Sequence, residues 1–173
     1  MALAIWWANQ HGYLLGHTLA ELMSAVVAWT ALAVATTSVQ FTRNHFVVFI
    51  AVGIGWWAGL DLLHTLSFKG MNLLPIDSTN PAIQFWVAGR ALQAAVLLLA
   101  PLMLWRSVSV MRLHLGFGGW TVLSVLLIAT GHFPDAYIDG QGLTPFKVYT
   151  EYLIIATMGA AAALFWHHPA LPP

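Results

Sequence analysis

The sequence predicts an all-α integral membrane protein, a bundle of five transmembrane helices. Of its 173 residues, 60% are hydrophobic and only 7% are charged, whereas soluble domains carry roughly 25% charged residues. The mean hydropathy is +0.77, and five apolar stretches reach the length of about 20 residues that a membrane crossing requires. Little sequence remains between these stretches, so residues 1–173 are expected to form a single transmembrane domain.

The expected helices follow one another with short polar connections. The third and the fifth have marked starts, because Asn80-Pro81 and Thr144-Pro145 each combine a capping residue with a proline suited to the first helical turn. The segment before the first helix, residues 1–12, is expected to lie in the membrane interface or to extend that helix. The five helices are expected at about residues 13–39, 45–66, 81–105, 113–131 and 145–166.

Charge and cysteine content exclude several functions. Six basic and six acidic residues give no net charge, which argues against a nucleic-acid surface. Cysteine is absent, which excludes disulfides, thiolate metal ligands and thiol catalysis. The connections after the first and third helices carry Arg43, Arg106 and Arg112 without acids. The positive-inside rule therefore predicts an outside N-terminus and a cytoplasmic C-terminus.

Six ionisable residues lie within the apolar stretches, where an unpaired charge costs roughly 3 kcal/mol or more. Because successive helices run in opposite directions, all six are expected on one side of the membrane, in its outer leaflet. The spacing within each helix supports one cluster, since residues three or four apart share a helix face. The six are His17, Glu21, Asp61, His64, Arg90 and Glu151.

Three further residues extend this cluster. Lys147 lies four positions before Glu151, Trp86 lies four before Arg90, and Lys69 follows the second helix. The simplest interpretation is structural, with buried ion pairs holding the helices together. Two histidines in one apolar cluster instead favour ligand binding, with pH sensing as an alternative.

Two cofactors suit such a pocket. His17 and His64 are candidate axial ligands of haem b, with Arg90, Lys69 or Lys147 at the propionates. The same histidines are candidate ligands of a metal ion such as copper or zinc, with the carboxylates orienting them. Zinc-protease and di-iron patterns, phosphate loops and nucleotide fingerprints are absent from the sequence.

Several runs resemble the third type of bacterial membrane-associated sensor domain, of the MASE group, and they occur in the same order. That family's motif positions correspond to His17, Glu21, Asp61, His64, Lys69, Arg90, Lys147 and Glu151. Phe68 departs from the pattern, where a tyrosine is more usual. The runs are His17–Leu22, Asp61–Met71, Trp86–Arg90, Phe133–Asp135 and Gly142–Lys147 leading to Glu151.

The resemblance implies a non-enzymatic input module in a bacterial inner membrane, coupled to a cytoplasmic output such as a diguanylate cyclase or a histidine kinase. The chain ends at Pro173, so the output is expected from a partner or from a longer protein. Expected partners are the lipid bilayer and that output, with pairing into a homodimer allowed and no nucleic acid. The competing functions are a haem-containing electron-transfer protein, a proton or ion translocator, and a metal-dependent membrane hydrolase.

Overall fold

The computed structural model describes residues 2–42, 44–71, 73 and 77–167. In that part of the chain, five helices are long and apolar enough to cross a membrane, which confirms the predicted all-α membrane bundle. The orientation of the termini stays a prediction, and Arg43, on which it partly depends, lies outside the described residues. The spans are Tyr13–Ser38, His45–Leu66, Asn80–Leu104, Val110–Ala129 and Pro145–His167.

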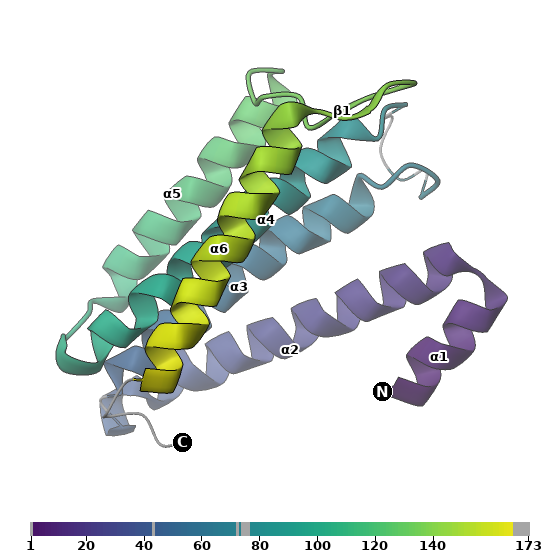
Figure 1. The fold of residues 1–173 in the computed structure, drawn as a ribbon. Helices are drawn as coiled ribbons and strands as arrows, with labels where there is room; N and C mark the ends of the chain where they lie inside the picture. Colours follow the sequence, from purple (N-terminus) through teal and green to yellow (C-terminus); the bar gives the residue numbers. More distant parts are fainter. Residues whose placement is uncertain (1, 43, 72, 74–76, 168–173) are drawn as a thin grey trace.

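Two helices form the centre of the bundle, α3 (His45–Leu66) and α4 (Asn80–Leu99). The helix α5 (Val110–Ala129) packs on both of them, whereas α6 (Pro145–His167) packs mainly on α4 (Figure 1). The long helix α2 (Tyr13–Thr42) packs extensively only on α3 and on the short N-terminal helix, and it diverges from the bundle toward its own N-terminus. The helix α2 is therefore attached to the rest of the bundle mainly through α3.

Glycine allows α3 to approach its neighbours closely. A Cβ atom at Gly53 would lie 2.6 Å from Cγ2 of Val96 in α4, and one at Gly55 would lie 2.5 Å from Cδ2 of Leu32 in α2. Both distances are shorter than van der Waals contact. Small residues take this role in membrane helix interfaces, where packing rather than the hydrophobic effect holds helices together.

The N-terminal segment forms a helix of its own, α1 (Ala2–His11). Gly12 has a φ of 147°, a conformation available to glycine, and it reverses the chain so that α1 folds back beside α2 (Figure 1). Asn9 then lies against Gly16, where an added Cβ would be 2.7 Å from the Asn9 Oδ1 atom. The helix α1 thus forms a helical hairpin with the first transmembrane helix and does not extend it.

The capping prediction is correct at one helix and wrong at the other. Thr144 caps α6, since its Oγ1 accepts a hydrogen bond from the backbone N–H of Lys147. Asn80 is instead the first residue of α4, with Thr79 at the cap position. The Asn80 Oδ1 atom accepts hydrogen bonds from the N–H groups of Ala136 and Tyr137, so it anchors the connection between α5 and α6.

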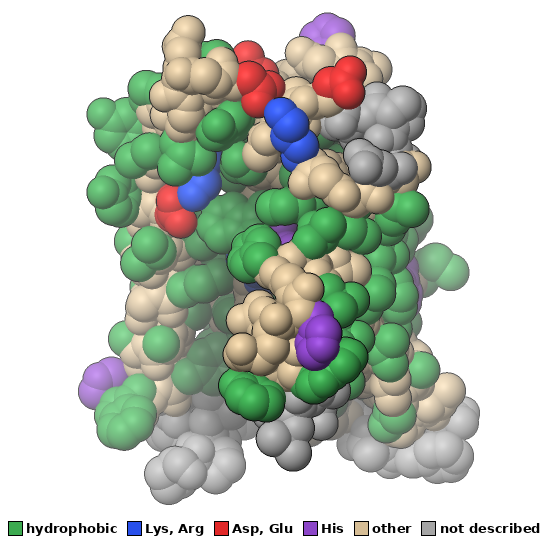
Figure 2. All heavy atoms as spheres, turned by 90° about the vertical axis from the view of Figure 1, so that its right-hand side faces the viewer, with side chains coloured by type: hydrophobic (Ala, Val, Ile, Leu, Met, Phe, Trp, Pro, Cys, Tyr) green, Lys and Arg blue, Asp and Glu red, His purple; other side chains and the backbone are tan. Residues whose placement is uncertain are grey.

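That connection contains a short hairpin of β1 (Tyr137–Ile138) and β2 (Gly142–Leu143), which pair antiparallel. The third transmembrane helix, expected over residues 81–105, also ends differently from expectation, because its last residues form the 3₁₀ helix η1 (Ala100–Trp105). On the face shown in Figure 2, charged side chains gather in the upper half, toward the end with β1, and hydrophobic side chains cover much of the remainder.

Candidate functional site

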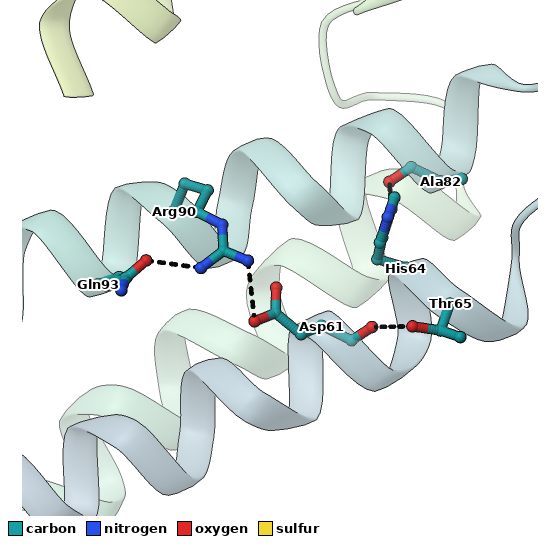
Figure 3. A network of polar contacts seen from close by, with 6 residues as sticks. All are labelled: Asp61, His64, Thr65, Ala82, Arg90 and Gln93. Carbon is teal, nitrogen blue, oxygen red and sulfur yellow. Dashed lines mark hydrogen bonds and ion pairs between the residues drawn. The ribbon is translucent and has the colours of Figure 1, made fainter. Parts of the chain in front are cut away.

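An ion pair joins the two central helices within their membrane spans. Arg90 of α4 donates from Nη2 to Oδ2 of Asp61 in α3 at 3.2 Å, and from Nη1 to Oε1 of Gln93 at 2.7 Å (Figure 3). The Asp61 side chain is 11% exposed and that of Arg90 is 24% exposed. The other carboxylate oxygen of Asp61, Oδ1, has no hydrogen-bond partner among the described residues. The Asp61 carboxylate is therefore only half satisfied.

His64 lies one turn from Asp61 and faces α4 (Figure 3). Its Nδ1 atom is 2.7 Å from the backbone oxygen of Ala82. Because a carbonyl oxygen only accepts, Nδ1 must be the protonated nitrogen, and Nε2 of the neutral ring then offers a lone pair. A backbone carbonyl on one ring nitrogen is the arrangement that orients histidines that bind metals through the other.

His17, near the start of α2, approaches His64 and so brings a third helix to the site. Its ring centroid lies 5.8 Å from that of His64, with the two rings nearly perpendicular at 88°. Phe68 packs against both imidazoles, at 5.4 Å from His17 and 6.2 Å from His64, and Tyr13 stacks on His17. The Nε2 atom of His17 is buried without a hydrogen-bond partner in the described part of the chain. The two histidines therefore form an aromatic cluster that includes an unsatisfied nitrogen.

A cavity of about 430 Å³ lies between α2, α3 and α4. Its polar side chains are Glu21, Ser24, Asp61, Arg90 and Gln93. Its remaining lining is apolar and consists of Ala25, Val27, Ala28, Ala31, Ile54, Trp57 and Ala58. A ligand in this cavity would contact side chains of three transmembrane helices at once.

A second polar group joins α4 to α6. Lys147 forms an ion pair with Glu151 one turn later in α6. The Lys147 Nζ atom also lies 4.8 Å from the centre of the Trp86 ring, and Cζ of Arg90 lies 5.9 Å from the same centre. Cations within about 6 Å of an indole face are attracted to it. Trp86 thus links the ion pair of Asp61 to that of Glu151.

The structure brings together all but one of the expected site residues, in two groups. His17, Glu21, Asp61, His64 and Arg90 surround the contacts of α2, α3 and α4, whereas Lys147, Glu151 and Trp86 lie between α4 and α6.

Lys69 does not join either group. It is exposed in the connection after α3 and forms no ion pair or hydrogen bond with the described residues. An exposed lysine in this position is therefore not part of the buried cluster.

The two histidines supply nitrogen donors, but the described residues contain no group of three or more His, Cys, Asp or Glu side chains able to hold a metal ion. The cavity described above is not lined by His17 or His64. Haem and metal binding stay predictions.

Two residues of the site were not identified as such from the sequence. Trp57 lies one turn before Asp61, so the spacing of four residues along α3 was a signal for it. Phe68 drew notice only as a departure from a motif, although it contacts both histidines. An aromatic residue just after a helix gives no local indication of where its ring will pack.

Comparisons with known proteins agree with this architecture. The profile of the MASE3 family, described as a membrane-associated sensor domain, matches residues 8–171. No curated protein and no solved structure matches the chain. Because the match spans all five transmembrane helices and both polar groups, the chain belongs to the MASE3 family of membrane-associated sensor domains.

Proposed function

We propose that this domain senses a small ligand that enters the cavity between α2, α3 and α4. The supporting observation is the placement of Glu21, Asp61 and Arg90 around that cavity within the membrane spans. Buried ionisable groups in a membrane are costly and usually mark a functional site. A carboxylate oxygen without a partner, Asp61 Oδ1, leaves bonding capacity for such a ligand.

Sensing requires that the ligand bind one packing of the helices better than another. The helix α2 suits this role because it packs extensively only on α3 and α1 and contributes one wall of the cavity. Closing α2 onto α3 and α4 around a ligand would change the surroundings of Arg90, which also contacts Trp86. Through Trp86 and Lys147 the change reaches α6, the last transmembrane helix.

In this proposal the membrane is a bacterial inner membrane, and the positive-inside rule predicts that the polar cavity lies in its outer leaflet. The ends of α2 and α6 away from the cavity then face the cytoplasm, where an output domain or protein would read their positions. The chain itself acts in this proposal as an input module without catalysis.

Distances between spin labels test this proposal. The chain has no cysteine, so cysteines can be placed at the exposed positions Leu15 in α2 and Tyr149 in α6 without background labelling. In phosphatidylcholine nanodiscs, adding a total lipid extract of a bacterial inner membrane is expected to narrow and shorten the distance distribution. The same extract is expected to have no effect on the Glu21→Gln variant. Identical distributions with and without extract in the unsubstituted protein would contradict the proposal.

The cofactor hypothesis has its own test. We propose that His17 and His64 hold one transition-metal ion, copper or zinc, or else the iron of haem b. Purified protein is expected to contain one metal equivalent, or to show a Soret band, and to lose either signal in His17→Ala and in His64→Ala. The matched control is His132→Ala, because His132 is exposed and, among the described residues, its ring bonds only to Thr130. Protein with neither metal nor haem absorbance would refute the cofactor hypothesis.

A further inference from the structure

The cavity at the polar cluster continues into a second one. A cavity of about 440 Å³ lies between α2 and α3 farther from the cluster, and it is lined mainly by apolar side chains. Ala31 and Ile54 line both cavities. The two cavities therefore adjoin each other along the contact of α2 and α3, and we call the pair the α2–α3 trench. The second cavity is lined by Ala31, Val34, Ala35, Ser38, Asn44, Val47, Val48, Ile50, Ala51 and Ile54.

The α2–α3 trench has the length of a lipid chain. Its wall on α2 extends from Glu21 to Ser38. At a rise of about 1.5 Å per residue, that distance is roughly 25 Å, compared with a hydrocarbon core of about 30 Å. The trench therefore follows most of one membrane crossing, with the charged side chains near one end, mainly apolar side chains along the rest, and Ser38 and Asn44 at the far end.

The charges at the polar end restrict the headgroup. Two carboxylates, Glu21 and Asp61, face one guanidinium, Arg90. Arg90 is already bonded to Asp61 and Gln93, whereas the Glu21 side chain makes no hydrogen bond or ion pair with the described residues. This end therefore has an excess of acceptors and of negative charge. A phosphate or carboxylate headgroup would be repelled, and a group that donates hydrogen bonds would be attracted.

Trp57 adds a second feature of the same end. Its side chain lines the polar cavity one turn from Asp61. An indole attracts either an ammonium group, through its π face, or an aromatic ring, through offset stacking. Both interactions are compatible with a headgroup that donates hydrogen bonds to the carboxylates.

We infer that the α2–α3 trench binds a single-chain amphiphile whose headgroup donates hydrogen bonds and carries no negative charge. A long-chain hydroquinone and a long-chain amine share this chemistry. The inference rests on the ligand-sensing function proposed above and names the class of its ligand. The headgroup meets Glu21 and Asp61, and the chain lies along Ala31 and Ala35 toward the other leaflet.

Four probes with similar tails test the headgroup, namely decylhydroquinone, decylquinone, dodecylamine and dodecyl phosphate. Binding is measured in phosphatidylcholine nanodiscs by isothermal titration, because that lipid has no donor in its headgroup and common maltoside detergents would compete. Dodecyl phosphate is expected to bind at least about tenfold more weakly than decylhydroquinone or dodecylamine, since it repels the carboxylates. Binding of decylhydroquinone alone would identify a quinol source, and binding of dodecylamine alone an amine source.

Comparing decylquinone with decylhydroquinone tests whether the headgroup must donate hydrogen bonds. Decylquinone has only acceptors, so it cannot donate to Glu21 or Asp61 and is expected to bind about tenfold more weakly than its hydroquinone. Glu21→Gln, which removes a charge without breaking an ion pair of the described residues, is expected to bring dodecyl phosphate closer to the affinity of dodecylamine.

Variants of the tail region complete the test. Ala31→Leu places a larger side chain at the junction of the two cavities and is expected to abolish saturable binding. Ala31 is exposed in the structure, so the substitution leaves the packed core intact. The matched control is Ala163→Leu on the exposed face of α6, which is expected to bind like the unsubstituted protein.

The outcomes separate this inference from the function on which it rests. Equal affinity for dodecyl phosphate and dodecylamine, or unchanged binding in Ala31→Leu, would overturn the inference. If the lipid extract moves α2 while none of the donor probes binds, the inference is wrong and the sensing function stands. If a donor probe binds in the expected manner and the distance between labels at positions 15 and 149 stays constant, the sensing function is wrong and the inference stands.

Discussion

Replacing Arg90 by alanine is expected to destabilise the domain by about 3–5 kcal/mol, the usual cost of removing one partner of a buried ion pair. The variant leaves Asp61 in the membrane span with neither carboxylate oxygen bonded to a side chain, because Oδ1 has no partner already. Trp86 would also lose one of its two cations. Unfolding of the purified protein by sodium dodecyl sulfate, followed by circular dichroism, measures the change.

A double-mutant cycle is the control for this prediction. Asp61→Ala with Arg90→Ala removes both charges, so the double variant is expected to be more stable than Arg90→Ala alone. Arg90→Lys keeps the charge but not the planar fork, so it is expected to lose part of the stability. Additive effects of the two alanine substitutions would show that the pair contributes no coupling energy.

Replacing Gly53 by alanine is expected to destabilise the domain by about 1–3 kcal/mol, the typical cost of overpacking a core. The added methyl group would lie 2.6 Å and 2.7 Å from the two γ carbons of Val96. Because Val96 is β-branched and fully buried, its side chain has little freedom to move away. The helices α3 and α4 would have to separate, which the same detergent titration measures.

Gly59 provides a matched control in the same helix. A Cβ atom there has no neighbour within 4 Å, so Gly59→Ala is expected to leave the stability unchanged or to raise it slightly through helix propensity. Val96→Ala combined with Gly53→Ala is expected to recover part of the loss, because it removes the atoms that clash. Equal destabilisation by Gly53→Ala and Gly59→Ala would contradict the steric explanation.

The sequence predicted the transmembrane helices closely because hydropathy and length decide where a chain can cross a membrane. The second span, His45–Leu66, was predicted to the residue. The first segment was harder, because a helix before Gly12 and a continuous helix through it have the same composition. The direction of the chain after Gly12 depends on its backbone conformation and on the contact of Asn9 with Gly16.

In the candidate site, too, some contacts could be predicted from the sequence and others could not. Helix periodicity placed Asp61 with His64 and Lys147 with Glu151, because residues three or four apart must share a face. Periodicity could not decide which carboxylate Arg90 would bind, since Glu21, Asp61 and Glu151 were all at a suitable depth. The packing of α3 against α4 made that choice, because it brings Asp61 to Arg90, whereas Glu151 pairs with Lys147 on its own helix.

Asn80 has a different role from the one expected from the sequence. An asparagine before a proline is typical of a helix cap, yet its side chain binds backbone groups 56 and 57 residues away. Those groups belong to a loop whose path is set by the whole bundle. Local sequence contains no information about such a distant partner.

The helix α6 is supported along one side only. Apart from its packing on α4, α6 is held by one aromatic contact near each end, where Phe146 meets Phe133 and Phe165 meets Phe46. Between these contacts its membrane face presents Leu153, Ile155 and other large apolar side chains directly to lipid. Turning such a helix about its long axis costs its lipid-facing side chains little, because those that leave one patch of hydrocarbon enter another, and the resistance comes from the contacts with α4, including that of Lys147 with Trp86. For the signalling proposed above, we therefore expect α6 to turn about its axis more readily than it slides along that axis.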